Sequence, residues 1–136
     1  MTAIGIEVSE SRVSNATKHV NDGPVVMLNL LRFAQTNSNQ GLDGKSLYMT
    51  GYVPAFNAVA ERVAPGKVTV RFLSTSVIGL VSSSKPSGYW HAVALVAYPS
   101  FDAFKAITSD AEYIKSALPH RLAALDDWTL VAMQES

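Results

Sequence analysis

The chain has 136 residues, 48% of them apolar and 16% charged, and its eleven basic and eleven acidic side chains cancel. This length predicts a single domain, residues 1–136, that is large enough to bury a core. The apolar content argues against disorder. Balanced charge without a basic patch argues against binding to nucleic acid or to an anionic membrane. Because cysteine is absent, disulfides, thiolate nucleophiles and cysteine-based metal sites are excluded.

The first part of the chain shows no targeting or membrane-spanning pattern. Residues 1–20 lack a basic start followed by an apolar run, and no stretch of about 18 apolar residues occurs. We therefore expect a cytoplasmic protein with no membrane partner. Residues 1–22 predict an N-terminal extension with a short apolar piece at Ile4–Ile6 and a short helix capped by Ser9 or Ser11. A turn follows at residues 21–24.

Residues 25–33 predict a strand with two apolar faces, interrupted by Asn29 on one face and by Arg32 on the other. A buried polar side chain needs a partner, so each is either satisfied by neighbouring backbone or solvent, or serves a site. Residues 34–45 form a polar loop that is long for a compact domain. Ser46 then caps a predicted helix that ends before Pro65-Gly66 and is kinked near Gly51 and Pro54.

The second half of the chain repeats the alternation of strand and helix. Residues 67–73 predict a strand that continues through 77–81 after a break, and residues 82–88 form a hairpin loop. Residues 89–98 predict a strand that is apolar on both faces and ends at Pro99. Ser100 caps a helix, residues 109–112 form a capping box, and Pro119 kinks the helix or starts another turn. Residues 128–133 predict the last strand.

The predicted order β-α-β-β-α-β is that of a ferredoxin-like α+β fold, a four-stranded antiparallel sheet with helices on one face. Two helices cover one side of a sheet, yet residues 25–33 and 89–98 are apolar on both sides. The uncovered face needs a partner, because a large exposed apolar patch is a liability. Since most soluble oligomers are symmetric, we expect a homodimer formed through the sheets.

Residues spread over the chain resemble an uncharacterised bacterial family of the dimeric α+β barrel superfamily. They are residues 24–33, Tyr48, Tyr52, Trp90, residues 98–100, Phe104, Ser109, Glu112, Tyr113, His120, Arg121, Asp127 and Leu130. The resemblance covers about residues 23–133 and implies the ferredoxin-like fold. The superfamily includes monooxygenases of the antibiotic-biosynthesis type that use neither metal nor flavin, lactone isomerases and haem-using branches. The sequence shows no set of residues that would ligate haem iron, so the resemblance does not lead us to expect haem in this chain.

His120 and Arg121, at the predicted helix break, are the candidate catalytic residues. Histidine titrates near neutral pH and serves as a general acid or base, while arginine holds a carboxylate or an enolate-like oxygen. The candidate ligand-binding residues are Asn29, Arg32, Tyr48, Tyr52 and Trp90. A structural interpretation stays open, in which His120 and Arg121 complement a helix end or pair with Glu112, Asp126 or Asp127.

The sequence contains no motif that indicates metal binding or cofactor chemistry. The three histidines have no short ligand spacing, and neither a nucleophile elbow nor a phosphate loop occurs. We therefore expect no metal and no cofactor. Two functions remain open: a homodimer that binds a small apolar or aromatic carbonyl compound, as a cofactor-independent monooxygenase- or isomerase-like enzyme or as a binder, and a non-catalytic regulatory or structural dimer.

Overall fold

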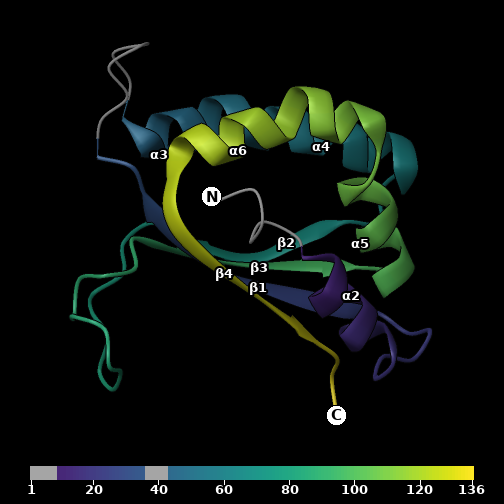
Figure 1. The fold of residues 1–136 in the computed structure, drawn as a ribbon, viewed down its shortest axis with the longest axis horizontal. Coiled ribbons are helices and arrows are strands. Elements are labelled where there is room, and N and C mark those ends of the chain that lie inside the picture. Colours follow the sequence, from purple (N-terminus) through teal and green to yellow (C-terminus); the bar gives the residue numbers. More distant parts are fainter. Residues whose placement is uncertain (1–8, 36–42) are drawn as a thin grey trace.

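The computed structural model describes residues 9–35 and 43–136. Four strands and several helical segments follow one another along the chain (Figure 1). In order they are α2 (Glu10–Thr17), β1 (Val25–Phe33), α3 (Gly44–Leu47), the π-helical turn η1 (Tyr48–Tyr52), α4 (Val53–Val63), β2 (Thr69–Ser74), β3 (Ala92–Tyr98), α5 (Phe101–Thr108), the π-helical turn η2 (Tyr113–Ala117), α6 (Leu118–Ala124) and β4 (Leu125–Met133).

The four strands form one antiparallel sheet in the order β2-β3-β1-β4. The helices α3, α4 and α6 lie together over one side of this sheet, and α5 closes one end (Figure 1). The α+β class and the ferredoxin-like plan predicted from the sequence are therefore confirmed. In the described part of the chain, no helix is both long enough and apolar enough to cross a membrane.

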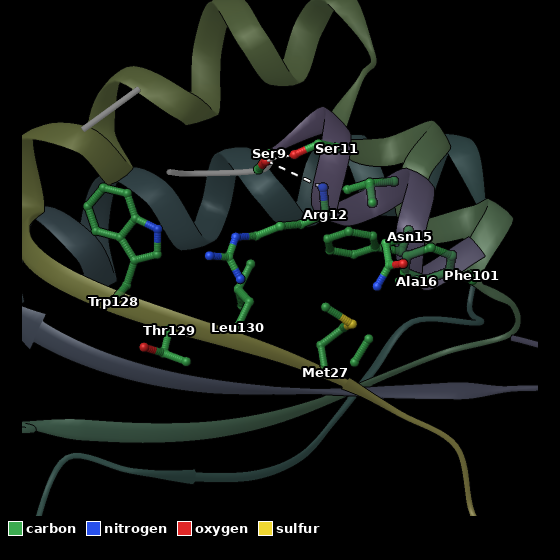
Figure 2. A pocket seen from close by; sticks show the side chains of 13 residues that line it. Ser9, Ser11, Arg12, Asn15, Ala16, Met27, Phe101, Trp128, Thr129 and Leu130 are labelled. Atoms are coloured by element: carbon green, nitrogen blue, oxygen red, sulfur yellow. Dashed lines mark hydrogen bonds between the residues drawn. The ribbon is translucent and has the colours of Figure 1, made fainter. Parts of the chain in front are cut away.

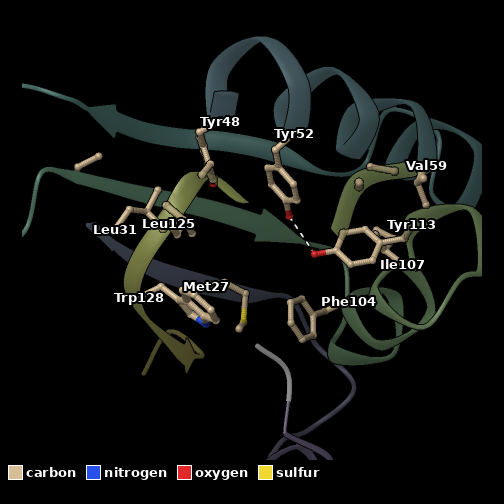
Figure 3. Close-up of a cluster of buried hydrophobic side chains, with 14 of the residues drawn as sticks. Met27, Leu31, Tyr48, Tyr52, Val59, Phe104, Ile107, Tyr113, Leu125 and Trp128 are labelled. Carbon is tan, nitrogen blue, oxygen red and sulfur yellow. Dashed lines mark hydrogen bonds between the residues drawn. The ribbon is translucent and has the colours of Figure 1, made fainter. Parts of the chain in front are cut away.

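The central strand β1 shows why the core lies on one side of the sheet. Its burial alternates strictly, with every second residue from Val25 to Phe33 buried and the residues between them half-buried. The buried set faces the helices and contributes Val25, Met27 and Leu31 to the main core cluster, part of which is drawn in Figure 3. Alternation follows from the strand geometry, which sends successive side chains to opposite faces.

The other side of the sheet, which we call the open face, carries apolar side chains that none of the helices in residues 9–35 and 43–136 covers. Cross-strand pairing places Leu28 opposite Leu95 on β3 and opposite Val131 on β4. Its larger apolar members are Val26, Leu28, Leu30, Phe72, Val93, Leu95, Val131 and Met133. Phe72, Val131 and Met133 are solvent-exposed, and the others are half-buried.

Two of the predicted helix starts are confirmed and two are corrected. Ser9 caps α2, and the Ser100 hydroxyl accepts a hydrogen bond of 3.1 Å from the backbone N–H of Ala103 at the start of α5. The helix for which Ser46 was the predicted cap instead begins three residues earlier, because Asp43 caps it and accepts a bond from the Ser46 N–H. The capping box predicted at residues 109–112 is wrong, since Asp110 accepts the bond from the Glu112 N–H.

The strand boundaries also differ from prediction, and β2 begins at Thr69 rather than at residue 67. Residues 77–81 are not a strand, because the pairing of β2 with β3 ends at Ser74 opposite Val93 and no strand of the described chain pairs with them beyond that point. β3 begins at Ala92 rather than at residue 89, although the His91 N–H still bonds the Leu31 carbonyl. β4 begins at Leu125, three residues before the predicted start. The piece predicted at Ile4–Ile6 and most of the predicted 34–45 loop lie outside the described residues.

Two isoleucines on neighbouring helical segments test where the core lies. Ile107 on α5 is 0% exposed, whereas Ile114 on η2 is 50% exposed. We expect Ile107→Ala to lower the free energy of unfolding by about 2–5 kcal/mol, because it leaves a cavity in a packed core. The matched control Ile114→Ala should cost less than about 1 kcal/mol. Urea denaturation measures both, and equal losses would contradict this placement of the core.

Candidate ligand-binding site

Each of the two long helical stretches over the sheet contains one π-helical turn. Tyr48 and Tyr52 lie on η1, and Tyr113 lies on η2, all three buried. Each π turn runs into an α-helix that has a proline at its second position, Pro54 in α4 and Pro119 in α6. Proline lacks an N–H and clashes with the carbonyl four residues earlier, so a local widening of the helix accommodates it. The kinks predicted near Pro54 and Pro119 take this form.

Arg121 on α6 points between these π turns into the interior and is 2% exposed. Its Nη1 donates a hydrogen bond of 3.4 Å to the Tyr48 hydroxyl. Its guanidinium carbon lies 5.3 Å from the centroid of the Tyr52 ring and 6.0 Å from that of the Tyr48 ring. At this range a cation is attracted by the electron-rich ring faces. The interior of the protein therefore holds a guanidinium group in an aromatic shell.

Further polar groups complete this interior group, which we call the buried cluster. The Tyr52 and Tyr113 hydroxyls lie 3.2 Å apart and share a hydrogen bond. Asn29 donates through Nδ2 to the carbonyls of Met27 and Ala94, at 3.3 and 3.4 Å. The members of the buried cluster are Asn29, Tyr48, Tyr52, Tyr98, Tyr113 and Arg121. A void of only about 20 Å³ lies between them.

Tyr98, the last residue of β3, keeps a neutral phenol. Burial raises the pKa of Tyr98 well above its ordinary value, the neighbouring Tyr52 adds to the rise, and the positive charge of Arg121 opposes it. Its ring packs edge-to-face against Phe104 at 5.3 Å and against Phe56 at 6.5 Å between centroids. The group therefore stays protonated at neutral pH and is unsuited to act as a base.

A larger pocket of about 790 Å³ adjoins the buried cluster, between α2, α5 and the helix-facing side of β1 and β4. Met27, Phe104 and Leu130 line both this pocket and the small void, so the two share a wall. Its other aromatic walls are Phe101 and Trp128. Figure 2 shows the side chain of Arg12 extending from α2 across this pocket toward Trp128 and Leu130. The side chains lining this pocket are Ser9, Ser11, Arg12, Val13, Asn15, Ala16, Met27, Phe101, Phe104, Trp128, Thr129, Leu130 and Ala132.

The structure brings four of the seven predicted site residues together and separates the other three. Asn29, Tyr48, Tyr52 and Arg121 belong to the buried cluster. Their assignment to a site remains a prediction, because spatial proximity alone does not establish a role.

Arg32 lies on the open face, across the sheet from Asn29, and its Nη1 donates to the Tyr89 carbonyl at 2.8 Å. Trp90 packs edge-to-face against Tyr89, with ring centroids 4.9 Å apart, and is not part of the main core cluster. His120 lies against Gly51 on η1, where an added Cβ would come within 2.7 Å of its Nδ1. The predicted catalytic pair therefore diverges, since Arg121 faces the interior and His120 faces the neighbouring helix.

Sequence analysis predicted none of the residues that line the larger pocket, and it did not select Tyr98 or Tyr113 of the buried cluster. From the sequence, Tyr98 and Tyr113 were interpreted as core residues, and Arg12 was placed on a helix that was expected to be peripheral. A signal was present for Tyr113, which precedes Arg121 by eight residues, about two helical turns. No local signal marked Arg12, because only the packing of α2 beside β4 brings it over the pocket. Within the described residues, no group of three His, Asp or Glu side chains gathers in a way that could hold a metal ion.

The fold and the site define a ferredoxin-like α+β protein with a polar cluster and a pocket between sheet and helices. No protein-family model matches the chain, and no curated protein matches it significantly. Solved structures do match. A protein of unknown function from Rhodopseudomonas palustris superposes with a TM-score of 0.76 at 24% identity, over 96% of each chain.

Two further solved structures share the fold at lower similarity. One is described as a dimeric protein of unknown function and ferredoxin-like fold from Bacteroides fragilis, with a TM-score of 0.51 and 14% identity, covering 83% of this chain and 97% of that one. The other, from Caulobacter crescentus, is described as a candidate antibiotic biosynthesis monooxygenase, with a TM-score of 0.51 and 13% identity over 90% and 98% of the two chains. The resemblance to uncharacterised bacterial proteins of this fold is thereby confirmed, and at these identities it concerns the fold alone.

The raised pKa of Tyr98 makes a prediction about stability at high pH. Above about pH 10 the unfolded chain loses this phenolic proton whereas the folded chain keeps it, so unfolding becomes easier as the pH rises. We expect the free energy of unfolding of the unmodified protein to fall above pH 10 by up to about 1.4 kcal/mol per pH unit more than that of Tyr98→Phe. Chemical denaturation between pH 7 and 11 measures this, and both proteins should respond alike below pH 9. Parallel curves above pH 10 would contradict the assignment.

Proposed function

We propose that the chain forms a homodimer and binds a small apolar or aromatic compound with a carbonyl or carboxylate oxygen. The observation that carries the binding proposal is the 790 Å³ pocket, whose apolar walls are crossed by the cationic side chain of Arg12. Small-molecule sites are typically concave and apolar with a few placed polar groups, and this size lies within their usual range of about 300–1,000 Å³.

The chemistry of the pocket supports the class of ligand. Met27, Phe101, Phe104 and Trp128 offer flat or flexible apolar surfaces to a hydrocarbon or an aromatic ring. Arg12 forms no ion pair with any acidic side chain in the described part of the chain. A ligand oxygen near Arg12 would accept a charge-assisted hydrogen bond, which is stronger than a neutral one.

The buried cluster supports a second polar contact deeper inside. It is separated from the pocket by shared wall residues, among them the flexible side chain of Met27. Displacement of these side chains would bring a ligand to the Tyr52 and Tyr113 hydroxyls and to Arg121. Catalysis by Arg121, with His120 as acid or base, stays a proposal within this scheme, and the burial of Arg121 beside the pocket supports it more directly than the position of His120 does. The similar Caulobacter protein is described as a candidate antibiotic biosynthesis monooxygenase, which is consistent with a monooxygenase-like reaction.

The homodimer is supported by the open face. Its eight larger apolar side chains run across all four strands, and no helix of the described residues covers them. A second copy placed sheet against sheet would bury this patch, and a two-fold symmetric contact uses the same patch on both subunits. The Bacteroides protein of the same fold is described as dimeric.

One observation favours the second candidate, a non-catalytic regulatory or structural dimer. The void inside the buried cluster holds no more than about 20 Å³, less than any substrate needs, and His120 is packed against Gly51. In that case the cluster would serve to fix the packing of the two helical stretches on the sheet. A ligand screen separates the two candidates.

Ligand binding is tested with a panel of aromatic carboxylates and aromatic ketones in a thermal-shift assay. A compound that prefers the folded state raises the melting temperature by mass action. We expect at least one compound to do so, and we expect Arg12→Gln to weaken its affinity by tenfold or more in calorimetry, because a charged donor is lost. Lys18→Gln, which removes a cation at the end of the same helix but outside the pocket, is the control and should leave the affinity unchanged. A panel without any shift would favour the non-catalytic dimer.

The sheet-face dimer is tested by a charge at the centre of the open face. We expect Leu28→Asp to shift the mass seen by light scattering from that of a dimer to that of a monomer, because an unpaired carboxylate at a buried interface is strongly unfavourable. Ile114→Asp, placed on the helical side of the molecule, should leave the dimer intact. Circular dichroism would verify that both variants fold. A monomeric unmodified protein would refute the homodimer.

A further inference from the structure

The connection between β2 and β3 presents two large apolar side chains fully to solvent. Ile78 is 104% and Val81 is 102% exposed, more than any other large apolar residue in the described part of the chain. Figure 1 shows this connection extending beyond the sheet on the side away from α3, α4 and α6. We call residues 77–87 the arm. Its tip therefore projects on the same side as the open face.

The arm has a defined shape rather than the character of a loose polar loop. The Leu80 N–H donates to the Ser87 carbonyl at 2.9 Å and joins the two limbs of the arm. The limbs approach so closely that a Cβ on Gly79 would lie 2.5 Å from the Ser87 hydroxyl oxygen. The Lys85 N–H bonds the Ser83 hydroxyl at 3.0 Å in a further local turn. Ile78 and Val81 are consequently held outward by the backbone of the arm.

The base of the arm is attached to the edge of the open face through Tyr89. Lys85 places its ammonium 4.6 Å from the centroid of the Tyr89 ring, and the Arg32 guanidinium lies at the same distance. The Tyr89 hydroxyl donates to the Asp127 carboxylate, and Arg32 donates to the Tyr89 carbonyl. Arg32 and Asp127 are opposite each other in β1 and β4. These contacts fix the direction of the arm relative to the open face.

We propose that the arm docks on a second copy of this chain, with Ile78 and Val81 packing against the partner subunit at the border of its open face. This inference rests on the proposed homodimer and extends it from the sheets to the loops. Lys85 is the one charged residue among residues 77–87, so the tip suits an apolar surface rather than a charged partner such as nucleic acid.

The geometry favours a second copy of this chain as the molecule that the arm contacts. The arm lies at the end of an apolar face that itself lacks a cover, and both features point to the same side of the molecule. In a two-fold symmetric dimer each arm contact occurs twice, so a modest apolar contact contributes doubly to association. Because the arm is already folded, little conformational entropy is lost when it docks.

The arm is tested with the double variant Ile78→Ser/Val81→Ser in the full-length protein. We expect its dimer dissociation constant, measured by analytical ultracentrifugation, to rise by at least tenfold. The free energy of unfolding at concentrations where the protein is monomeric should not change, because neither side chain is buried within the subunit. The matched control is Val70→Ser/Ile114→Ser, which removes one exposed valine and one exposed isoleucine elsewhere and should leave the dissociation constant unchanged.

The outcomes separate the two proposals. An unchanged dissociation constant in the arm variant, while Leu28→Asp gives monomers, would overturn the docking of the arm and leave the sheet-face dimer standing. An unmodified protein that stays monomeric would overturn both. A second readout uses the absence of native cysteine: Ile78→Cys should react with a maleimide at least fivefold more slowly above the dissociation constant than below it. Equal rates would also overturn the docking of the arm.

Discussion

The whole architecture depends on one constraint, which is that the two central strands are apolar on both faces while the helices of one subunit shield one face only. Every second residue of β1 is buried beneath the helices, and the alternate residues form the open face with Leu95 and Val131. Removal of apolar surface from water is the dominant favourable term in folding, and it operates on the second face as well. The sheet therefore sets where the core lies, and its second apolar face is the basis of the proposed homodimer.

Within the covered half, the unusual feature is a cation buried among phenols. Arg121 is placed there by a helix that begins after a π turn, and the tyrosines that surround it come from both π turns and from the end of β3. Burial of polar groups is costly unless hydrogen bonds satisfy them, so such a cluster is retained where it fixes the packing or serves a ligand. The wall shared with the adjoining pocket favours the second explanation, and the small volume inside the cluster favours the first. Under both explanations, α2 and the helices above the sheet enclose the pocket and the buried cluster.

On the uncovered half, two features support the proposed second subunit. The open face carries apolar side chains across all strands, and the arm carries two more beyond its end. The residues at the base of the arm, Arg32, Tyr89 and Asp127, are polar and bond one another. Arg32 thus contributes to the shape of the arm, whereas a position in the ligand site was predicted for it. A residue on the opposite strand face cannot reach the buried cluster.

Periodicity and turn chemistry alone determined much of this molecule: the strand at residues 25–33, a helix cap at Ser9 or Ser11, the cap at Ser100, and the alternation of strands and helices that gives the ferredoxin-like plan. These features follow from local rules, in which side-chain alternation and hydrogen bonding act between near neighbours along the chain. Sequence reasoning also selected Asn29, Tyr48, Tyr52 and Arg121, which the fold gathers into one cluster. Only the tertiary structure decided that His120 turns toward Gly51, that Tyr98 and Tyr113 join the cluster, that Arg12 crosses a pocket and that residues 77–81 leave the sheet. The direction of a side chain in a widened helix, and the absence of a partner strand, depend on contacts between segments far apart in the chain, which no local pattern encodes.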